Sequence, residues 1–490
     1  MSQYYKHMIY ELSRAGRPGF AVPGSSATPD KYLKELPSGF LRQQQANLPS
    51  VSQVDVTRHY TNLSTKNVGI DTCFYPLGSC TMKYNPRLNE GAAALAGFSK
   101  VHPYTPDSLA QGLLRIYYEL EQDLCEVSGF DAVSLQPAAG AQGELTSLFI
   151  IQAYYRDRGD KRDEILVPDS AHGTNPASCT LAGFKSVAVK SGDDGLIDVV
   201  DLRSKVNDNT AGMMITNPNT LGLFEENIAE IADILHDRGA LLYMDGANFN
   251  AIMGYTRPGD FGVDVQHFNL HKTFSTPHGG GGPGCGPIGV KSPLEPFLPV
   301  PRVRLHANKF TTDCDAPKSI GRVRQFLGNT GVIIRAYTYL RSLGGEGLKK
   351  VSETAVLNAN YLLALLRDNF KVPFDRPCMH EFVLDASPQA KDGVTAMDIA
   401  KTLLDYGFHP MTVYFPLIVH ECMMIEPTET ESKATLDSFA AAMLEICDKV
   451  QTDKDAFTAA PRSKPVTRLD EVRAAKQPVL RWQPQNNIGE

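Results

Sequence analysis

Short apolar runs alternate with amphipathic segments between residues 130 and 290. Residues 165–167 and the runs GMMIT and ALLYM have the length of buried strands, and each leads into a polar loop. The segment IAEIADILHDRG, between the last two runs, has helical spacing and ends at Gly239. Strands that alternate with helices predict an α/β fold, in which helices cover a mostly parallel sheet. Ligands of such sheets bind at the carboxyl ends of the strands, where these polar loops lie.

The segments on either side of this region predict further parts of the molecule. Apolar residues at helical spacing predict a helix over residues 111–128 that stops at Gly129. A glycine turn and a long helical pattern follow residue 343, whereas the first hundred residues lack sustained periodicity. The predicted order is an N-terminal arm (residues 1–100), a large domain (101–343), a small C-terminal α/β domain (344–451) and an extended tail (452–490).

Composition narrows the class of protein. A chain of 490 residues is long enough for two or three domains. Its net charge of −7 argues against a nucleic-acid partner, which would need a basic face. No apolar stretch approaches 18 residues, and the start MSQYYKHMIYELSR lacks the apolar core of a signal peptide. We therefore expect a cytoplasmic protein without a membrane partner; a matured organellar protein remains an alternative.

The nine cysteines form no CxxC pair and show no cysteine-histidine spacing typical of zinc. We expect reduced thiols and no metal site. Cys73 and Cys80 flank the turn-forming segment PLGS. Small buried side chains are the favoured interpretation of both, and a redox role is the alternative.

Lys272 is the best candidate for a reactive residue. It lies in HFNLHKTFSTPHGGGGPG, among histidines, hydroxyl side chains and glycines, and such a lysine can form an imine with a flat aldehyde cofactor. Pyridoxal 5'-phosphate (PLP) is the expected cofactor, because Asp245 in MDGAN ends a strand one βα unit earlier and can pair with the pyridine nitrogen. The alternatives are a solvated surface lysine and an aspartate that caps a helix.

Other loops offer groups that a phosphate or a ring requires. The turn at Gly140, Ala141 and Gln142 opens a helix, so that its amides and the helix dipole can hold a phosphate dianion. Close packing of the helix on the sheet is the alternative. Asn248 and Asn217 are rival candidates for the phenolic oxygen of the cofactor, and turn formation explains either equally well.

His172 follows a strand end, where its ring could stack on the pyridine, and His271 could assist proton transfer next to Lys272. Either histidine could instead be a satisfied polar or packing residue. Hydroxyls for the phosphate are available at Thr273, Ser275 and Thr276, with Thr276 included in the predicted set. The glycine run that begins at residue 279 lacks the GxxxxGK pattern of a nucleotide loop and favours a conformationally permissive loop.

Several blocks together resemble a known family. They are YPLGSCTMKYNPR, LQPAAGAQGE, PDSAHGTNPAS, NPNTLGLFE, YMDGANFNA, NLHKTFSTPHGGGGPG and FLGNTG, spread over most of residues 70–331. The chain resembles subunit 2 of two-subunit glycine decarboxylase, the P-protein of the glycine cleavage system. Tyr84 departs from the Leu or Phe that is commoner in the family, outside the cofactor motifs.

The resemblance implies a PLP-dependent transferase of fold type I, with a mostly parallel seven-stranded sheet. It implies that Lys272 carries the Schiff base, His172 stacks on the ring and Asp245 pairs with the pyridinium. The implied activity is glycine dehydrogenase (aminomethyl-transferring): glycine loses its carboxyl group as carbon dioxide, and its aminomethyl group passes to the lipoyl arm of H-protein. The implied partners are lipoylated H-protein and a companion subunit 1, with two copies of each subunit and with the N-terminal arm wrapping the companion.

Two other interpretations remain open. One is a different fold-type-I PLP enzyme, namely an aminotransferase, a desulfurase or an amino-acid decarboxylase. The other is a non-catalytic scaffold subunit, which the joint presence of Lys272 and Asp245 argues against. The groups that would bind the glycine carboxylate are not identified, although three basic candidates lie near FLGNTG: Arg322, Arg324 and Arg335.

Overall fold

The computed structural model describes residues 7–17, 19, 32–44, 46–279 and 284–482. The chain divides into two units, Met1–Thr72 and Cys73–Glu490. The described part of the first unit contains the short helix η1 (Ser38–Phe40) and the longer helix α3 (Gln53–Ser64). Helix α3 begins at a capping box in which Ser52 accepts from the Asp55 amide and the Asp55 carboxylate accepts from the Ser52 amide.

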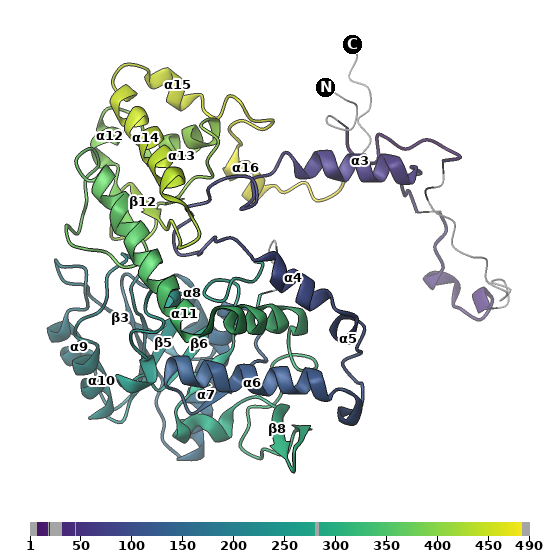
Figure 1. Ribbon diagram of the computed structural model, residues 1–490, viewed down its shortest axis with the longest axis vertical. Coiled ribbons are helices and arrows are strands. Elements are labelled where there is room, and N and C mark those ends of the chain that lie inside the picture. Colours follow the sequence, from purple (N-terminus) through teal and green to yellow (C-terminus); the bar gives the residue numbers. More distant parts are fainter. Residues whose placement is uncertain (1–6, 18, 20–31, 45, 280–283, 483–490) are drawn as a thin grey trace. The chain divides into compact units, whose positions relative to one another are not determined.

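A seven-stranded sheet forms the centre of the second unit (Figure 1). Its strand order is β1-β7-β6-β5-β4-β2-β3; β7 runs antiparallel to both neighbours, and the other pairs are parallel. The prediction of a mostly parallel seven-stranded sheet is therefore confirmed. The strands are β1 (Ala132–Ser134), β2 (Glu164–Pro168), β3 (Lys185–Val189), β4 (Thr210–Thr216), β5 (Leu241–Gly246), β6 (Val265–Phe268) and β7 (Ile288–Val290).

Alternate residues of the central strands enter two different cores, because side chains along a strand point to opposite faces. In β5, Tyr243 joins the core under α7 (Gly140–Asp157) and α8 (Thr174–Leu181), whereas Leu242 joins the core shared with α6 and α10. Both faces are thus covered by helices, which explains why these strands are apolar throughout. The second face carries α6 (Gln111–Ser128) and α10 (Ile228–His236), and α9 (Val199–Lys205) contacts β3.

Helix α6 ends where the sequence predicts. Gly129 follows its last residue in the left-handed conformation (φ 77°) and donates to the Cys125 carbonyl, a helix end that glycine adopts without a steric penalty. Two segments beside this helix complete this part of the unit: the hairpin β8 (Arg302–His306) and β9 (Lys309–Asp313), and the helices α4 (Arg87–Ala94) and α5 (Ala96–Ser99).

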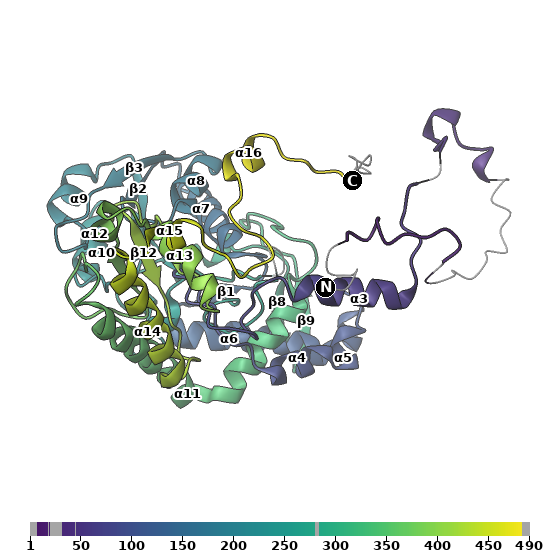
Figure 2. The same ribbon diagram turned by 90° about the horizontal axis from the view of Figure 1, so that it is seen from above.

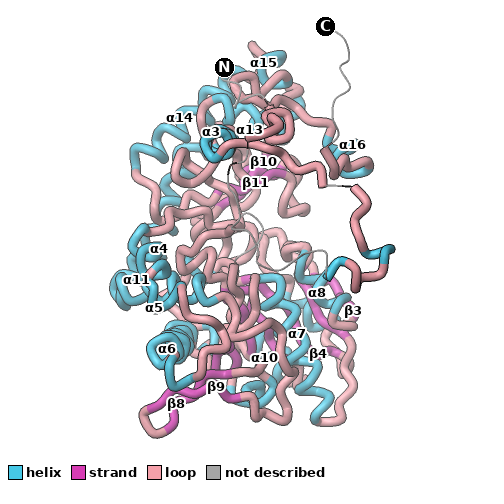
Figure 3. Tube along the Cα trace, turned by 90° about the vertical axis from the view of Figure 1, so that its right-hand side faces the viewer, coloured by secondary structure: helices cyan, strands magenta, loops and turns pink. Residues whose placement is uncertain are grey.

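A second, three-stranded antiparallel sheet has the order β10-β12-β11, and Figure 3 shows it apart from the large sheet. Helix α11 (Thr330–Leu366) connects the two regions, with one non-helical residue, Gly344, within it. The buried apolar residues of α11 up to Val351 enter the core of the large sheet, and those from Ala359 on enter the core of the small sheet. Figure 2 shows α14 beside α11. The elements of this region are β10 (Phe382–Asp385), β11 (Thr412–Val413), β12 (Cys422–Ile425), α12 (Ser387–Lys391), α13 (Ala396–Asp405) and α14 (Lys433–Lys449).

Two predicted segments differ from the structure. Residues 73–100, expected to belong to the arm, group with the second unit, and Phe74 and Lys83 are buried there. The tail, expected to be extended, contains the short helices α15 (Lys454–Thr458) and α16 (Glu471–Lys476). The finer domain boundaries remain a prediction. Across the described residues, no helix combines the length and the apolarity needed to cross a membrane.

Candidate active site

A cavity of about 280 Å³ lies at the carboxyl ends of β4, β5 and β6, beside the start of α7. This is the place at which parallel sheets bind ligands, because the loops there diverge and the strand ends present polar groups. Six of the predicted site residues line the cavity: Gly140, Ala141, His172, Asp245, His271 and Lys272. It is also lined by residues that the motifs did not single out for a role: Ser79, Ala139, Glu144, Thr174, Thr216, Thr220, Ala247, His267 and Asn269.

Lys272 follows β6 and donates from Nζ to the Ser79 carbonyl at 2.7 Å. Another lysine, Lys83, is buried nearby in a different environment. Its Nζ donates to the Thr273 carbonyl (2.9 Å) and the Tyr339 hydroxyl (3.1 Å), and pairs with Glu429 at 2.6 Å. Burial disfavours the charge of Lys83, but Glu429 outweighs it and raises the pKa well above the usual range. Lys83 is therefore held as an ammonium ion, whereas Lys272 faces the cavity.

Asp245 and His267 occupy paired positions on the adjacent strands β5 and β6. His267 Nε2 lies 3.5 Å from Asp245 Oδ1 and 2.9 Å from Asn269 Nδ2, and its Nδ1 lies 2.6 Å from the Tyr243 hydroxyl. Burial acts to raise the pKa of Asp245, but His267 and Lys272 outweigh it and hold the pKa below its usual value. Asp245 is thus a buried carboxylate that stays ionised at the floor of the cavity.

Glu144 adds a second carboxyl group beside Asp245, one helical turn after Gly140 on α7. It accepts from Thr174 Oγ1 (3.0 Å), from Ser178 Oγ (3.1 Å) and from Asn175 Nδ2, which also lies 3.3 Å from Asp245 Oδ2. Burial and then the charge of Asp245 raise the pKa of Glu144 to about 8. The two neighbouring carboxyl groups are therefore in different states at neutral pH, with Glu144 protonated and Asp245 charged.

The two predicted histidines lie at the cavity in different settings. His172 is exposed, and its Nδ1 lies 2.8 Å from Thr174 Oγ1 and 3.2 Å from the Thr174 amide. His271 is partly buried, and burial together with the charge of Lys272 lowers its pKa to about 3. His271 is therefore neutral at physiological pH, and its Nδ1 accepts from the Cys285 amide at 3.4 Å.

The start of α7 approaches the cavity closely because its residues are small. A Cβ at Gly140 would lie 2.3 Å from Asn269 Oδ1, so that any larger residue would displace the Asn269 side chain. The first amides of a helix have no partner within it and carry the positive end of the helix dipole. The turn therefore offers an anion-binding surface at one end of the cavity.

Four other predicted residues do not line this cavity. Gln142 is turned away, donating to the Val323 carbonyl at 2.7 Å. Asn217 accepts from the Glu225 amide at 3.0 Å, and Asn248 donates to the Pro218 carbonyl at 2.9 Å. The Thr276 hydroxyl is buried. The side chains of Gln142, Asn217 and Asn248 thus hold loops together around the site, and their contacts with a cofactor stay predictions.

The remaining candidates also lie outside the lining. Ser275 donates to the Tyr84 carbonyl at 2.7 Å, and Thr273 is buried. Arg335 forms two 2.8 Å contacts with Glu90, so that its charge is already paired. Arg322 and Arg324 do not line the cavity. Most of the predicted permissive glycine loop, residues 280–283, lies outside the described residues.

Sequence patterns carried a signal for two residues that we missed. His267 occupies the position of β6 that pairs with Asp245, and the alternation of side chains limits the residues of β6 on the same face to every second one. Glu144 lies four residues after Gly140, and residues at this spacing share a helix face. Ser79 carried no local signal, because it reaches Lys272 from 193 positions away in the chain.

Two family models match parts of the chain. The one for the C-terminal domain of glycine dehydrogenase matches residues 351–465, and the one for class-V aminotransferases matches residues 142–282. A probable glycine dehydrogenase (decarboxylating) subunit 2 of Caldanaerobacter subterraneus subsp. tengcongensis is 55% identical over 98% of this chain and 100% of its own length. The protein of the same description from Staphylococcus haemolyticus is 54% identical, with 97% of each chain covered.

Solved structures share the fold at lower identity. Glycine decarboxylase (P-protein) of the glycine cleavage system, in inhibitor-bound form, superposes with a TM-score of 0.74 at 20% identity, covering 87% of this chain and 100% of the other. A glutamate decarboxylase of Lactobacillus brevis gives a TM-score of 0.65 at 12% identity, with coverage of 84% and 96%. By its near full-length identity to these relatives, the chain belongs to the glycine dehydrogenase (decarboxylating) subunit 2 family and has the fold of type I PLP enzymes.

Proposed function

We propose that this chain binds PLP through Lys272, decarboxylates glycine and passes the aminomethyl group to the lipoyl arm of H-protein, acting together with a subunit 1. Membership of the family and the class-V aminotransferase match support PLP as the cofactor. The observation that carries the proposal is the convergence of Lys272, Asp245 and the start of α7 on one cavity.

The donor set of the cavity fits this cofactor. Asp245 is buried and ionised, and Thr216 lines the cavity with a buried hydroxyl that finds no hydrogen-bond partner among the described residues. A charged carboxylate in such a place calls for a cationic partner, because burying an unpaired charge costs several kcal/mol in order of magnitude. A protonated pyridine ring supplies that partner, and the amides of α7 suit a phosphate dianion. When bound, PLP supplies an electron sink for the electron pair that carbon dioxide leaves behind.

Each residue of this chain has a proposed task in the reaction. Lys272 would hold the cofactor covalently at Nζ. Asp245 would keep the ring nitrogen protonated; His267 lies beside that carboxylate, and Asn269 contacts His267 in turn. His172 would cover one face of the ring, and neutral His271, next to Lys272, would assist proton transfer.

The proposed partners rest on membership of the family and on exposed apolar side chains of the first unit. The relatives are named as subunit 2, which supports a companion subunit, and we propose two copies of each. In the first unit, large apolar side chains are exposed, and such side chains are typical of protein interfaces. They include Tyr32, Leu33, Leu36, Phe40 and Leu48. We propose that these residues contact subunit 1, in a cytoplasmic complex that includes H-protein.

Borohydride reduction tests the covalent link. Protein incubated with PLP and reduced should carry the cofactor on the peptide containing Lys272, and the variant Lys272→Arg should carry none. Lys83 is an internal control, because it lies near Lys272 but is buried and held as an ammonium ion. Label on Lys83, or on neither lysine, would contradict the proposal.

Exchange of labelled bicarbonate into the carboxyl group of glycine tests the reaction. With subunit 1 and lipoylated H-protein present, we expect exchange that depends on Lys272. An aminotransferase or a desulfurase of the same fold would bind the cofactor but catalyse no such exchange. Cofactor binding without exchange would therefore support PLP as the cofactor but contradict glycine as the substrate.

A further inference from the structure

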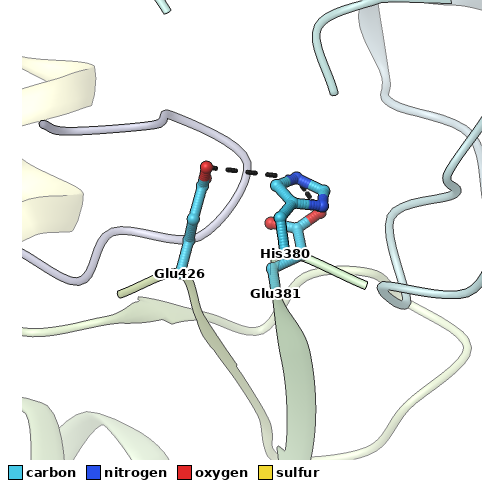
Figure 4. Close-up of side chains that lie close together, drawn as sticks. All are labelled: His380, Glu381 and Glu426. Atoms are coloured by element: carbon cyan, nitrogen blue, oxygen red, sulfur yellow. Dashed lines mark ion pairs between the residues drawn. The ribbon is translucent and has the colours of Figure 1, made fainter. Parts of the chain in front are cut away.

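Two glutamates meet at the edge of the small sheet. Phe382 pairs with Ile425 in the antiparallel β10–β12 ladder, which places Glu381 and Glu426 opposite each other one position beyond it. Both side chains are fully buried, together with His380. Figure 4 shows the His380 ring beside the two carboxyl groups; its Nε2 lies 3.7 Å from Glu381 and 4.0 Å from Glu426. Like charges in directly opposite positions destabilise a sheet. The folded protein must therefore contain interactions that offset the repulsion between these two carboxyl groups.

Two amides of one short loop donate to the pair, and Asn248 Nδ2 lies 3.4 Å from Glu381 Oε1. Glu381 accepts from the Ser79 amide at 2.6 Å, and Glu426 accepts from the Thr81 amide at 2.8 Å. Ser79 and Thr81 both have positive φ angles, 62° and 48°, which residues with a side chain adopt at a cost. The two carboxyl groups therefore hold the Ser79–Thr81 loop in a strained shape.

That shape determines what Lys272 meets. The Ser79 carbonyl accepts from Lys272 Nζ at 2.7 Å, and the Cys80 carbonyl lies 2.9 Å from His278 Nε2. Residues before the loop are fastened to the small sheet as well, since Thr412 Oγ1 donates to the Gly78 carbonyl at 2.8 Å. The loop thus bridges the small sheet and the cavity, with the amides of Ser79 and Thr81 held on one side and the Ser79 carbonyl presented to the lysine on the other.

We infer that Glu381 and Glu426 are positioning residues: they lock the Ser79–Thr81 loop so that the Ser79 carbonyl receives the amine of Lys272 whenever glycine displaces it. This inference rests on the proposed role of Lys272. Once released, the Lys272 amine needs a fixed hydrogen-bond acceptor. Without one, the side chain would move and lose the alignment with the cofactor that its return requires. The carbonyl supplies that acceptor without adding a group that competes for the cofactor.

The charges around the pair are consistent with this role. Burial and then Glu426 raise the pKa of Glu381 well above its usual value, and burial raises the pKa of Glu426. The groups that face the pair are Lys272, Glu429, Cys80 and His380, whose pKa burial lowers to about 3. His380 is therefore neutral, and protonation of one member of the pair removes most of the repulsion without a further cation.

The reactivity of Cys80 in cofactor-free protein tests directly whether Glu381 and Glu426 hold the Ser79–Thr81 loop. Cys80 lies between the two held amides and is only partly exposed, and burial raises the pKa of its thiol, so that we expect slow reaction with a thiol reagent. Glu381→Met and Glu426→Met keep the volume of the side chain and remove the acceptor. We expect each to speed peptide-resolved labelling of Cys80 by about 10- to 100-fold, the range that corresponds to leaving a buried amide donor without its acceptor. Glu381→Gln and Glu426→Gln keep an acceptor oxygen and should restore slow labelling.

Glu121→Met is the matched control, because Glu121 is a buried carboxyl on α6, outside the loop. Unchanged Cys80 labelling in the Met variants would overturn the inference, and so would equal acceleration in Glu121→Met, which indicates general loosening. A metal ion bound in stoichiometric amount and lost in His380→Ala would also overturn it, since the cluster would then be a metal site.

A second measurement tests whether the shape of the Ser79–Thr81 loop affects Lys272. In holoenzyme, the Met variants should slow the glycine-dependent change in cofactor absorbance, while the Gln variants should keep most of the rate. Failure of the protein to bind PLP would reject the proposed function but leave the labelling result valid. Fast labelling with an unchanged absorbance rate would reject the role toward Lys272.

Discussion

Asp245 and Glu144 show that neighbouring carboxyl groups can carry different charges. Both are buried at the cavity, yet His267 and Lys272 keep Asp245 ionised, whereas burial and the charge of Asp245 keep Glu144 protonated. The two residues should therefore respond differently to the same change from a carboxyl group to an amide.

We expect Asp245→Asn to lower the rate of glycine decarboxylation by about 100- to 1,000-fold, the usual loss when one electrostatic partner is removed from an active site. Glu144→Gln should change the rate by less than about 10-fold, because a neutral amide can replace a neutral acid in its hydrogen bonds. Bicarbonate exchange and the absorbance of the bound cofactor measure both variants. Equal losses would show that Glu144 is charged in the working enzyme.

At the scale of elements, α6 places a buried acid in a mainly apolar helix. Burial raises the pKa of Glu121 to about 8, although Arg302 and Arg304 act in the opposite direction. In the unfolded chain this carboxyl loses its proton near its ordinary pKa of 4.5. Between these values the folded state binds more protons than the unfolded state, so that the stability falls as the pH rises.

We therefore expect the unfolding free energy of the wild-type protein to fall relative to that of Glu121→Gln between about pH 5 and pH 8. The slope should approach 1.4 kcal/mol per pH unit at most, as an order-of-magnitude limit for one proton. Urea unfolding at several pH values gives this difference. Parallel curves for the two proteins would mean that Glu121 is already ionised in the fold.

Elements that depend on local chemistry could be predicted from the sequence, and contacts between distant segments could not. The end of α6 at Gly129, the position of Asp245 at the end of β5 and the choice of Lys272 as the reactive lysine follow from residues within a few positions. Ser79 reaches Glu381 across 302 positions, and no periodicity encodes that pairing. The arm was predicted too long for the same reason, since residues 73–100 obtain their order from distant partners rather than from their own pattern.

At the scale of the whole molecule, the exposed apolar residues of the arm support the proposed contact with subunit 1. Phe40 is 82% exposed and Leu48 74% exposed. We expect Phe40→Ser with Leu48→Ser to weaken binding of subunit 1 by at least about 30-fold, which corresponds to one lost hot spot of roughly 2 kcal/mol. Sedimentation of the mixed subunits measures the effect.

Val200→Ser is the control for this experiment, because Val200 is similarly exposed but lies on α9, in the second unit. The arm variant should retain the cofactor absorbance of the wild-type protein. An arm variant that binds subunit 1 as tightly as the wild-type protein would remove the arm from the interface.

Gly344 interrupts α11 within the part that packs on the large sheet, with φ 62° and ψ −179°, a backbone conformation that is almost exclusive to glycine. Leu348 and Val351 still belong to the core of the large sheet, and from Ala359 onward the helix packs against the small sheet, whose edge carries Glu381 and Glu426. Each residue added to a helix rotates the rest of the helix by about 100°. A single insertion in the helix after Val351 would rotate the small sheet out of phase with Lys272, whereas the backbone at Gly344 restricts which residue can stand there.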